Sequence, residues 1–169
     1  GIYLAMYAKK GFLTKFLRIC IETLSSLPSI VVGLFGYLVF LVFFGLGKSL
    51  LAGALSVSIL AIPVITTTTE DAINGLPGHY LQASLGLGAT RWQSIYKVVI
   101  PAAGSGILSG IILGLARAFG EALAVAMVIG QTTALPKGLF STTKSLTTEI
   151  AAQMGNATEG GEMKTALWT

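Results

Sequence analysis

The sequence predicts an all-α protein, a polytopic bundle of transmembrane helices. Of its 169 residues, 53% are hydrophobic and only 11% are charged, whereas about a quarter of the residues of a soluble domain are charged. The mean hydropathy is +0.79. Apolar runs long enough to cross a bilayer alternate with short polar segments. Together these three observations place the chain in a membrane.

Three complete spans are expected along the chain. The first covers residues 27–46 and has Pro28 in its first turn, where proline is tolerated. The second covers residues 50–67 and the third runs from Pro101 to about residue 129. A stretch of roughly 20 apolar residues is enough for a hydrocarbon core of about 30 Å.

Partial spans are expected at both ends of the sequence. Residues 1–8 read as the end of an apolar helix, and the residues from Met163 onward as the start of another. We therefore expect residues 1–169 to form one transmembrane domain, truncated at both ends.

The basic residues predict the orientation of these spans. The net charge is +4, but the basic residues do not cluster with aromatic residues on a polar face, so no nucleic-acid partner is expected. Cytoplasmic flanks of membrane proteins are enriched in Lys and Arg. Segments 70–101 and 131–162 are accordingly expected to be a cytoplasmic and an extracytoplasmic loop. The inner basic residues are then Lys9, Lys10, Lys15, Arg18, Arg91 and Lys97, and the outer ones Lys48, Lys137 and Lys144.

Other common sites are not predicted. A single cysteine, Cys20, excludes an internal disulfide, and a single histidine, His79, leaves no usual metal-ligand cluster. Gly47-Lys48-Ser49 resembles the end of a phosphate-binding loop, but Val42 stands where that motif requires glycine. We expect no metal, cofactor or nucleotide site in this chain.

The end of the second span and the residues that follow it, 66–71, are polar and can be helical. Threonines 66–69 can satisfy backbone groups that Pro63 frees. Glu70 and Asp71 come next and are expected to begin a new helix, because acidic residues favour the first helical turn.

Residues 82–101 are a polar, amphipathic segment between two apolar runs. Gly88 lies near the middle, where glycine allows the positive φ of a sharp turn. We expect two short helices joined at Gly88, with Pro101 opening the next span. The second helix is expected to carry Ile95, Val98 and Val99 on one side. The layout indicates a loop built for contact with a partner, although an ordinary surface loop would also fit.

The third span carries small residues on one stripe and two charges beside it. Gly106, Gly110 and Gly114 recur every four residues, which favours close helix packing. Arg117 and Glu121 continue near the same stripe. A charge deep in a bilayer costs at least ~2.5 to 3.5 kcal/mol. The two residues therefore either form an ion pair that holds the bundle together, or Arg117 faces an anion's route while Glu121 sets its charge balance; both can be true.

The spacing within residues 82–101 resembles the E-A-A-x3-G-x9-I-x-L-P signature of the permease subunits of bacterial ABC importers. The matching positions are Gln82, Ala83, Ser84, Gly88, Val98, Ile100 and Pro101. This resemblance implies a coupling helix that docks into the ATP-hydrolysing subunit through Gln82, Ala83, Ser84, Gly88, Arg91 and Pro101. Gln82 replaces the glutamate and Ser84 an alanine, which weakens any salt bridge from position 82.

Segments 27–36, 85–92 and 114–121 look like the permease subunits of the bacterial high-affinity phosphate importer. The resemblance covers most of residues 1–130 and implies the type I ABC importer permease fold, with about three complete spans plus partial first and last spans. Residues 1–36 are more similar to one of its two permeases, and residues 124–130 to the other, the C-type subunit.

On this resemblance the chain is expected to be a phosphate permease subunit in a bacterial inner membrane, which it crosses several times. The implied partners are a second permease subunit, a dimer of ATP-binding subunits that hold ATP and Mg²⁺, an extracytoplasmic phosphate-binding protein and the lipid bilayer. An alternative is a permease for molybdate or sulfate. An intramembrane enzyme would need Ser–His or paired Asp residues inside spans, whereas His79 and Asp71 lie in the loop. A scaffold without transport would not explain Arg117 and Glu121.

Overall fold

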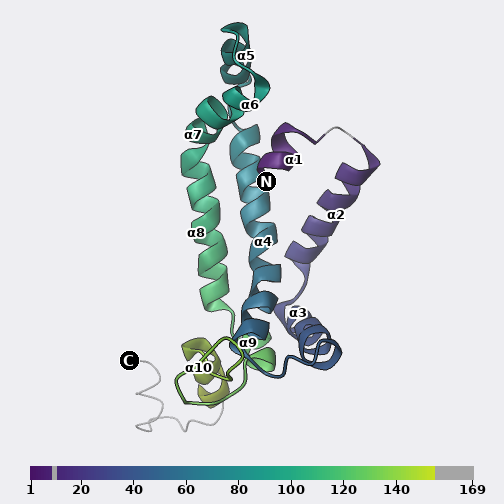
Figure 1. The fold of residues 1–169 in the computed structure, drawn as a ribbon, viewed down its shortest axis with the longest axis vertical. Coiled ribbons are helices and arrows are strands. Elements are labelled where there is room, and N and C mark those ends of the chain that lie inside the picture. Colours follow the sequence, from purple (N-terminus) through teal and green to yellow (C-terminus); the bar gives the residue numbers. More distant parts are fainter. Residues whose placement is uncertain (9–10, 155–169) are drawn as a thin grey trace. The chain divides into compact units, whose positions relative to one another are not determined.

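The computed structural model describes residues 1–8 and 11–154, and every regular element in this part of the chain is a helix (Figure 1). The predicted all-α class is therefore confirmed. In chain order the elements are α1 (Ile2–Met6), α2 (Phe12–Ser26), α3 (Ser29–Gly36), the π-helix η1 (Tyr37–Phe43), α4 (Leu50–Asn74), α5 (His79–Gly86), α6 (Arg91–Ser94), the π-helix η2 (Ile95–Val99), α7 (Ile100–Ala102), α8 (Gly104–Gly120), α9 (Leu123–Val128) and α10 (Leu146–Met154).

Among the described residues, α4 is the one helix that is long and apolar enough to cross a membrane unbroken, with 25 residues. Two bent helix pairs are also long and apolar enough if each counts as one span. The first is α2 with α3 and η1. The second is Arg91–Ala102 with Gly104–Gly120, and these two helices meet at a bend of 68°. The expected last span, from Met163 onward, lies outside the described residues.

Helix α4 is longer than the predicted span 50–67. It continues to Asn74, so Glu70 and Asp71 lie in its last turns and do not begin a new helix as we expected. The hydroxyls of Thr67 and Thr68 donate to carbonyl oxygens four residues earlier, at 3.0 and 2.9 Å, so both hydroxyls are satisfied within the helix. The chain leaves the helix only where Gly75 and Pro77 follow.

The third span is interrupted, which the sequence did not predict. Helix α8 ends at Gly120 and α9 begins at Leu123, so the expected continuous helix 101–129 is wrong. One oxygen of the Glu121 carboxylate accepts a hydrogen bond from the Ala124 backbone N–H at 3.2 Å. This bond satisfies a free donor in the first turn of α9, and a break before α9 is thereby stabilised.

The described residues form two compact units. The first comprises Gly1–Ser26 and Ala61–Ala116. Its core is the buried trio Ile73, Val99 and Ala103, which joins α4, η2 and the start of α8. Partly buried side chains from α1, α5 and α8 pack around this trio: Ile2, Ala5, Met6, Leu81 and Ile107.

The glycine stripe of α8 contacts α4 inside the first unit, and Figure 1 shows the two helices side by side. A Cβ atom at Gly106 would overlap the Ala72 side chain, and one at Gly110 would lie 3.0 Å from Thr68 Cβ. A Cβ atom at Gly114 would overlap Ile65. The absent side chains therefore let the two helix backbones approach closely.

We expect Gly106→Ala to destabilise this helix pair by about 1 to 3 kcal/mol, the range for overpacking a tight site. Gly104→Ala is the matched control, because a Cβ atom at Gly104 meets nothing within 4 Å. Thermal unfolding of the protein in detergent should show a lower Tm for Gly106→Ala alone. Equal Tm values for the two variants would show that the α4–α8 contact is looser than described.

The second unit comprises the described residues of Leu27–Leu60 and Arg117–Thr169. Val32, Leu60 and Ala124 form its buried apolar cluster, in which α3 packs on α9. A Cβ atom at Gly33 would lie 2.7 Å from Ala124 Cα, so glycine is needed for this contact. Polar residues are buried here too: Ser56, fully buried, donates to the Ala52 carbonyl at 2.9 Å.

Candidate functional site

The predicted coupling segment, residues 82–101, lies within α5, α6, η2 and α7 and the turn that joins α5 to α6. Gly88 has φ +84°, a conformation that residues with a side chain rarely adopt. A Cβ atom at this position would meet nothing within 4 Å. Glycine is thus required for the backbone conformation of the turn and not for lack of space.

Helix α6 begins with a capping box, whose T-x-x-Q pattern the sequence analysis missed. The Thr90 hydroxyl accepts from the Gln93 backbone N–H at 3.3 Å, and the Gln93 side chain accepts from the Thr90 N–H at 2.9 Å. The Ser84 hydroxyl donates to that of Ser94 at 2.9 Å and links α5 to α6. Ser94 is fully buried, so the turn is fixed at both ends.

The coupling segment exposes several large apolar side chains. The exposed fractions are 89% for Leu87, 64% for Trp92 and 63% for Tyr96, while Ile95 is fully buried. Gln82, Ala83 and Pro101 are also exposed, and Ser84 is partly buried. Exposed aromatic residues on a rigid support are typical of protein contact surfaces.

Arg91 lies at the start of α6, but its side chain reaches α1. Its Nη2 donates to the carbonyl oxygen of Met6 at 2.7 Å. The guanidinium carbon lies 5.6 Å from the centroid of the Tyr7 ring. The hydrogen bond joins residues 85 positions apart in the sequence, and no local pattern predicted either contact.

A second cation in the first unit is paired. Arg18 of α2 forms an ion pair with Glu70 of α4, whose side chain is 9% exposed. An unpaired buried carboxylate would be costly, so the pair accounts for Glu70 inside α4. The sequence analysis assigned Arg18 only to the basic flank; Lys9 and Lys10 of that flank lie outside the described residues.

Arg117 and Glu121 lie in the second unit but form no ion pair with each other. Arg117 is exposed in the last turn of α8, where a cation is favoured by the helix dipole. Because α8 ends at Gly120, the i,i+4 geometry that would bring Arg117 and Glu121 together is lost. In the described part of the chain Arg117 has no hydrogen-bond or ion-pair partner.

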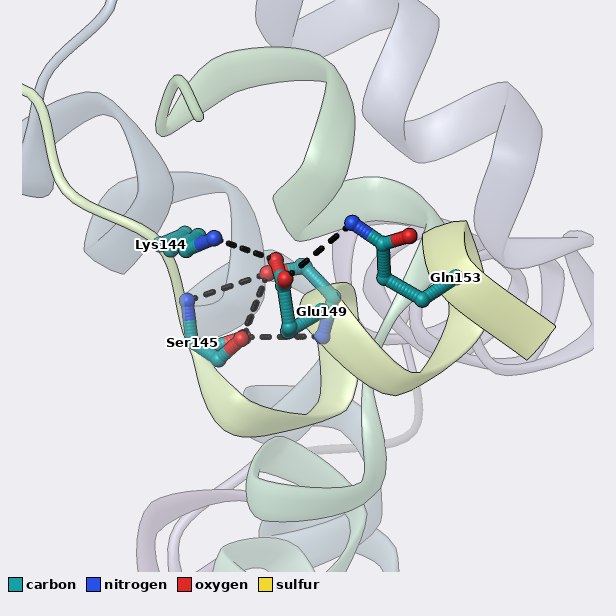
Figure 2. A network of polar contacts seen from close by, with 5 residues as sticks. Lys144, Ser145, Glu149 and Gln153 are labelled. Carbon is teal, nitrogen blue, oxygen red and sulfur yellow. Dashed lines mark hydrogen bonds and ion pairs between the residues drawn. The ribbon is translucent and has the colours of Figure 1, made fainter. Parts of the chain in front are cut away.

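A polar network lies at the start of α10, within the predicted extracytoplasmic segment 131–162, of which the structure describes residues 131–154. Figure 2 shows Lys144 and Gln153 converging on the Glu149 carboxylate. Lys144 Nζ lies 2.6 Å from Glu149 Oε2, and Gln153 Nε2 lies 3.3 Å from Oε1. The Ser145 hydroxyl accepts from the Thr148 N–H at 3.3 Å and caps the helix. The sequence analysis did not pair these residues.

The hydrogen bond from Lys144 lowers the pKa of Glu149 from its ordinary value. A lowered pKa in the folded state stabilises the fold above the unfolded-state pKa of about 4.3, and this stabilisation is lost as the pH falls. We expect Glu149→Gln to lower the Tm of the protein slightly at pH 7. The difference should shrink as the pH falls below the unfolded-state pKa and through the lowered folded-state pKa. Glu22→Gln, at an exposed position of α2, is the control; an unchanged Glu149→Gln difference across this range would contradict the ion pair.

No three His, Cys, Asp or Glu side chains gather in a metal-binding arrangement within residues 1–8 and 11–154. The clearest local feature of the coupling segment is its helical turn, which is held by a capping box and exposes large apolar side chains.

Comparison with known proteins identifies the family. The model of the family described as "Binding-protein-dependent transport system inner membrane component" matches residues 1–155. The chain belongs to this family. The expectation of a transport component, and not of an intramembrane enzyme, is thereby confirmed.

Similar proteins include several that are named as transport permeases. The chain is 45% identical over 161 residues to the probable ABC transporter permease protein YqgH of Bacillus subtilis (strain 168), covering 92% of this chain and 52% of that protein. It is 32% identical over 182 residues to the phosphate transport system permease protein PstC of Haemophilus influenzae, with coverage of 93% and 57%.

A third relative is the phosphate transport system permease protein PstA 2 of Mycobacterium bovis, 38% identical over 138 residues, with coverage of 82% and 46%. The chain thus spans about half the length of the curated relatives that it matches. Both PstC-type and PstA-type proteins are similar to it, so the similarity alone does not choose the C-type subunit that residues 124–130 favoured.

Proposed function

We propose that this chain belongs to the membrane-spanning subunit of an ATP-driven importer, and that it crosses a bacterial inner membrane several times. The observation that carries the proposal is the coupling segment: a turn fixed by Gly88 and the Thr90 capping box, which exposes Leu87, Trp92 and Tyr96. A partner subunit can bind such a surface without disrupting its helical structure. Hydrolysis of Mg²⁺-bound ATP in that partner would supply the energy for transport.

The coupling residues Gln82, Ala83, Ser84, Gly88 and Pro101 form or flank this turn. Closing of a dimer of ATP-binding subunits would displace the segment and shift the helix bundle between inward- and outward-facing states. A second permease subunit completes the pathway, and an extracytoplasmic binding protein delivers the substrate.

The proposed substrate is phosphate. Arg117 supports an anionic substrate, because its guanidinium is exposed and unpaired within the described residues, and guanidinium binds oxyanions through paired N–H donors. Phosphate is favoured over other oxyanions by the names of the PstC and PstA relatives. Glu121, near Arg117 in the sequence, would limit how tightly the anion is held and so permit its release.

The experiment that tests this proposal uses the protein together with the second permease subunit, the ATP-binding subunits and the extracytoplasmic binding protein. The assembly is expressed in bacterial cells that lack their own phosphate importer, and uptake of radiolabelled phosphate is measured against uptake of sulfate and molybdate. Energy-dependent phosphate uptake is expected. If the assembly takes up sulfate or molybdate but not phosphate, that oxyanion replaces phosphate as the proposed substrate. If it takes up none of the three, the oxyanion proposal is rejected.

A further inference from the structure

Arg91 occupies a position that its own helix does not favour. It is the first residue of α6, directly after the capping residue Thr90, and the positive end of the helix dipole disfavours a cation there. Its side chain instead turns to the carboxyl end of α1. There the Met6 carbonyl oxygen accepts from Nη2 at 2.7 Å, and the last carbonyls of a helix have no partner within the helix.

The contact has an aromatic component as well. The guanidinium lies over the Tyr7 ring at 5.6 Å, within the range of a cation–π interaction. Tyr7 in turn stacks on Tyr3, with ring centroids 6.3 Å apart. The arginine therefore contacts both a carbonyl and a ring at the end of α1, which a lysine of the same charge would match less well.

An apolar contact links the same two parts of the chain. Ile2, Ala5 and Met6 of α1 pack around the cluster that contains Val99 of η2, and Leu81 of α5 packs around the same cluster. The coupling segment and α1 thus pack around one apolar cluster, and Arg91 adds a direct polar contact between them.

We infer that Arg91 is a positioning residue that holds α1 onto the coupling segment, so that α1 moves with this segment when the ATP-binding subunits close. The inference rests on the proposed function for the source of the movement. It assigns Arg91 to a contact within the chain, whereas the resemblance to importer permeases implied a contact with the ATP-binding subunit.

The test compares Arg91→Ala, Arg91→Lys and a control, Lys15→Ala, in the complete transporter in lipid nanodiscs and vesicles. Lys15→Ala also removes one exposed cation from the first unit. The first readout is hydrogen–deuterium exchange of residues 2–8. We expect exchange to be roughly two- to fivefold faster in Arg91→Ala, as for loss of one exposed charged contact. Arg91→Lys should be intermediate and Lys15→Ala unchanged.

The second readout is phosphate uptake per ATP hydrolysed. Arg91→Ala should lower this ratio while ATP-binding subunits still co-purify and hydrolyse ATP, an effect that a purely structural role would not give. If hydrogen–deuterium exchange of residues 2–8 is unchanged in Arg91→Ala, the inference is overturned whatever the substrate. It is also overturned if exchange is faster but the uptake per ATP hydrolysed is unchanged. If the unmodified transporter moves no phosphate but exchange is faster in Arg91→Ala, the phosphate proposal fails while the contact between Arg91 and α1 is supported. Uptake per ATP hydrolysed is then measured with whichever oxyanion is transported.

Discussion

Gly88→Val is expected to uncouple ATP hydrolysis from transport without preventing membrane insertion. The φ of +84° at Gly88 costs a residue with a Cβ atom about 1 to 2 kcal/mol, and a β-branched residue is the least tolerant. Since about 1.4 kcal/mol is tenfold in an equilibrium constant, the equilibrium constant for forming the turn that presents Leu87 and Trp92 should fall about tenfold. Phosphate uptake per ATP should fall accordingly.

Gly88→Asn is the matched control, because asparagine adopts a positive φ more readily than other residues with a side chain. Open space surrounds position 88, so neither side chain clashes and the two variants differ mainly in backbone preference. Uptake and ATP hydrolysis are measured in proteoliposomes with all subunits present. Wild-type uptake by Gly88→Val would refute a coupling role for the turn.

Arg117→Gln is expected to lower phosphate uptake by about 10- to 100-fold, the effect of losing a hydrogen bond to a charged group at about 1.5 to 3 kcal/mol. Assembly should be unaffected, because Arg117 makes no hydrogen bond or ion pair within the described residues. Arg117→Lys should retain part of the uptake. Lys137→Gln removes the same charge from an exposed position and should leave uptake unchanged.

The measurement is initial uptake at several phosphate concentrations, together with co-purification of the partner subunits. If Arg117→Gln disrupts the assembly as well as uptake, then Arg117 supports the bundle and is not a pathway residue. Intact assembly with normal uptake would also remove it from the pathway.

Local features were predictable from the sequence because they depend on neighbouring residues. The turn at Gly88 follows from glycine's access to positive φ, and the smooth stripe of Gly106, Gly110 and Gly114 follows from helical spacing. The helix α4 that receives this stripe was not predictable, since spacing along one helix does not identify its neighbour. The capping box of Thr90 and Gln93 was also predictable, because it follows a local T-x-x-Q pattern.

Contacts between distant residues were not predictable. Arg18 and Glu70 are 52 positions apart, and only the fold brings them together. The break after Gly120 escaped prediction because an apolar run continues on both sides of it. The sequence could therefore suggest an ion pair between Arg117 and Glu121, which requires a continuous helix that the structure does not have.

The interruption between α8 and α9 also determines what can surround it. Backbone N–H and C=O groups that leave the helical pattern cannot face hydrocarbon, because lipid chains offer them no hydrogen bonds. Residues 120–122 must therefore face protein or water at whatever depth they lie. The break is thus a place in the third span that water, a neighbouring subunit or another part of the protein has to cover.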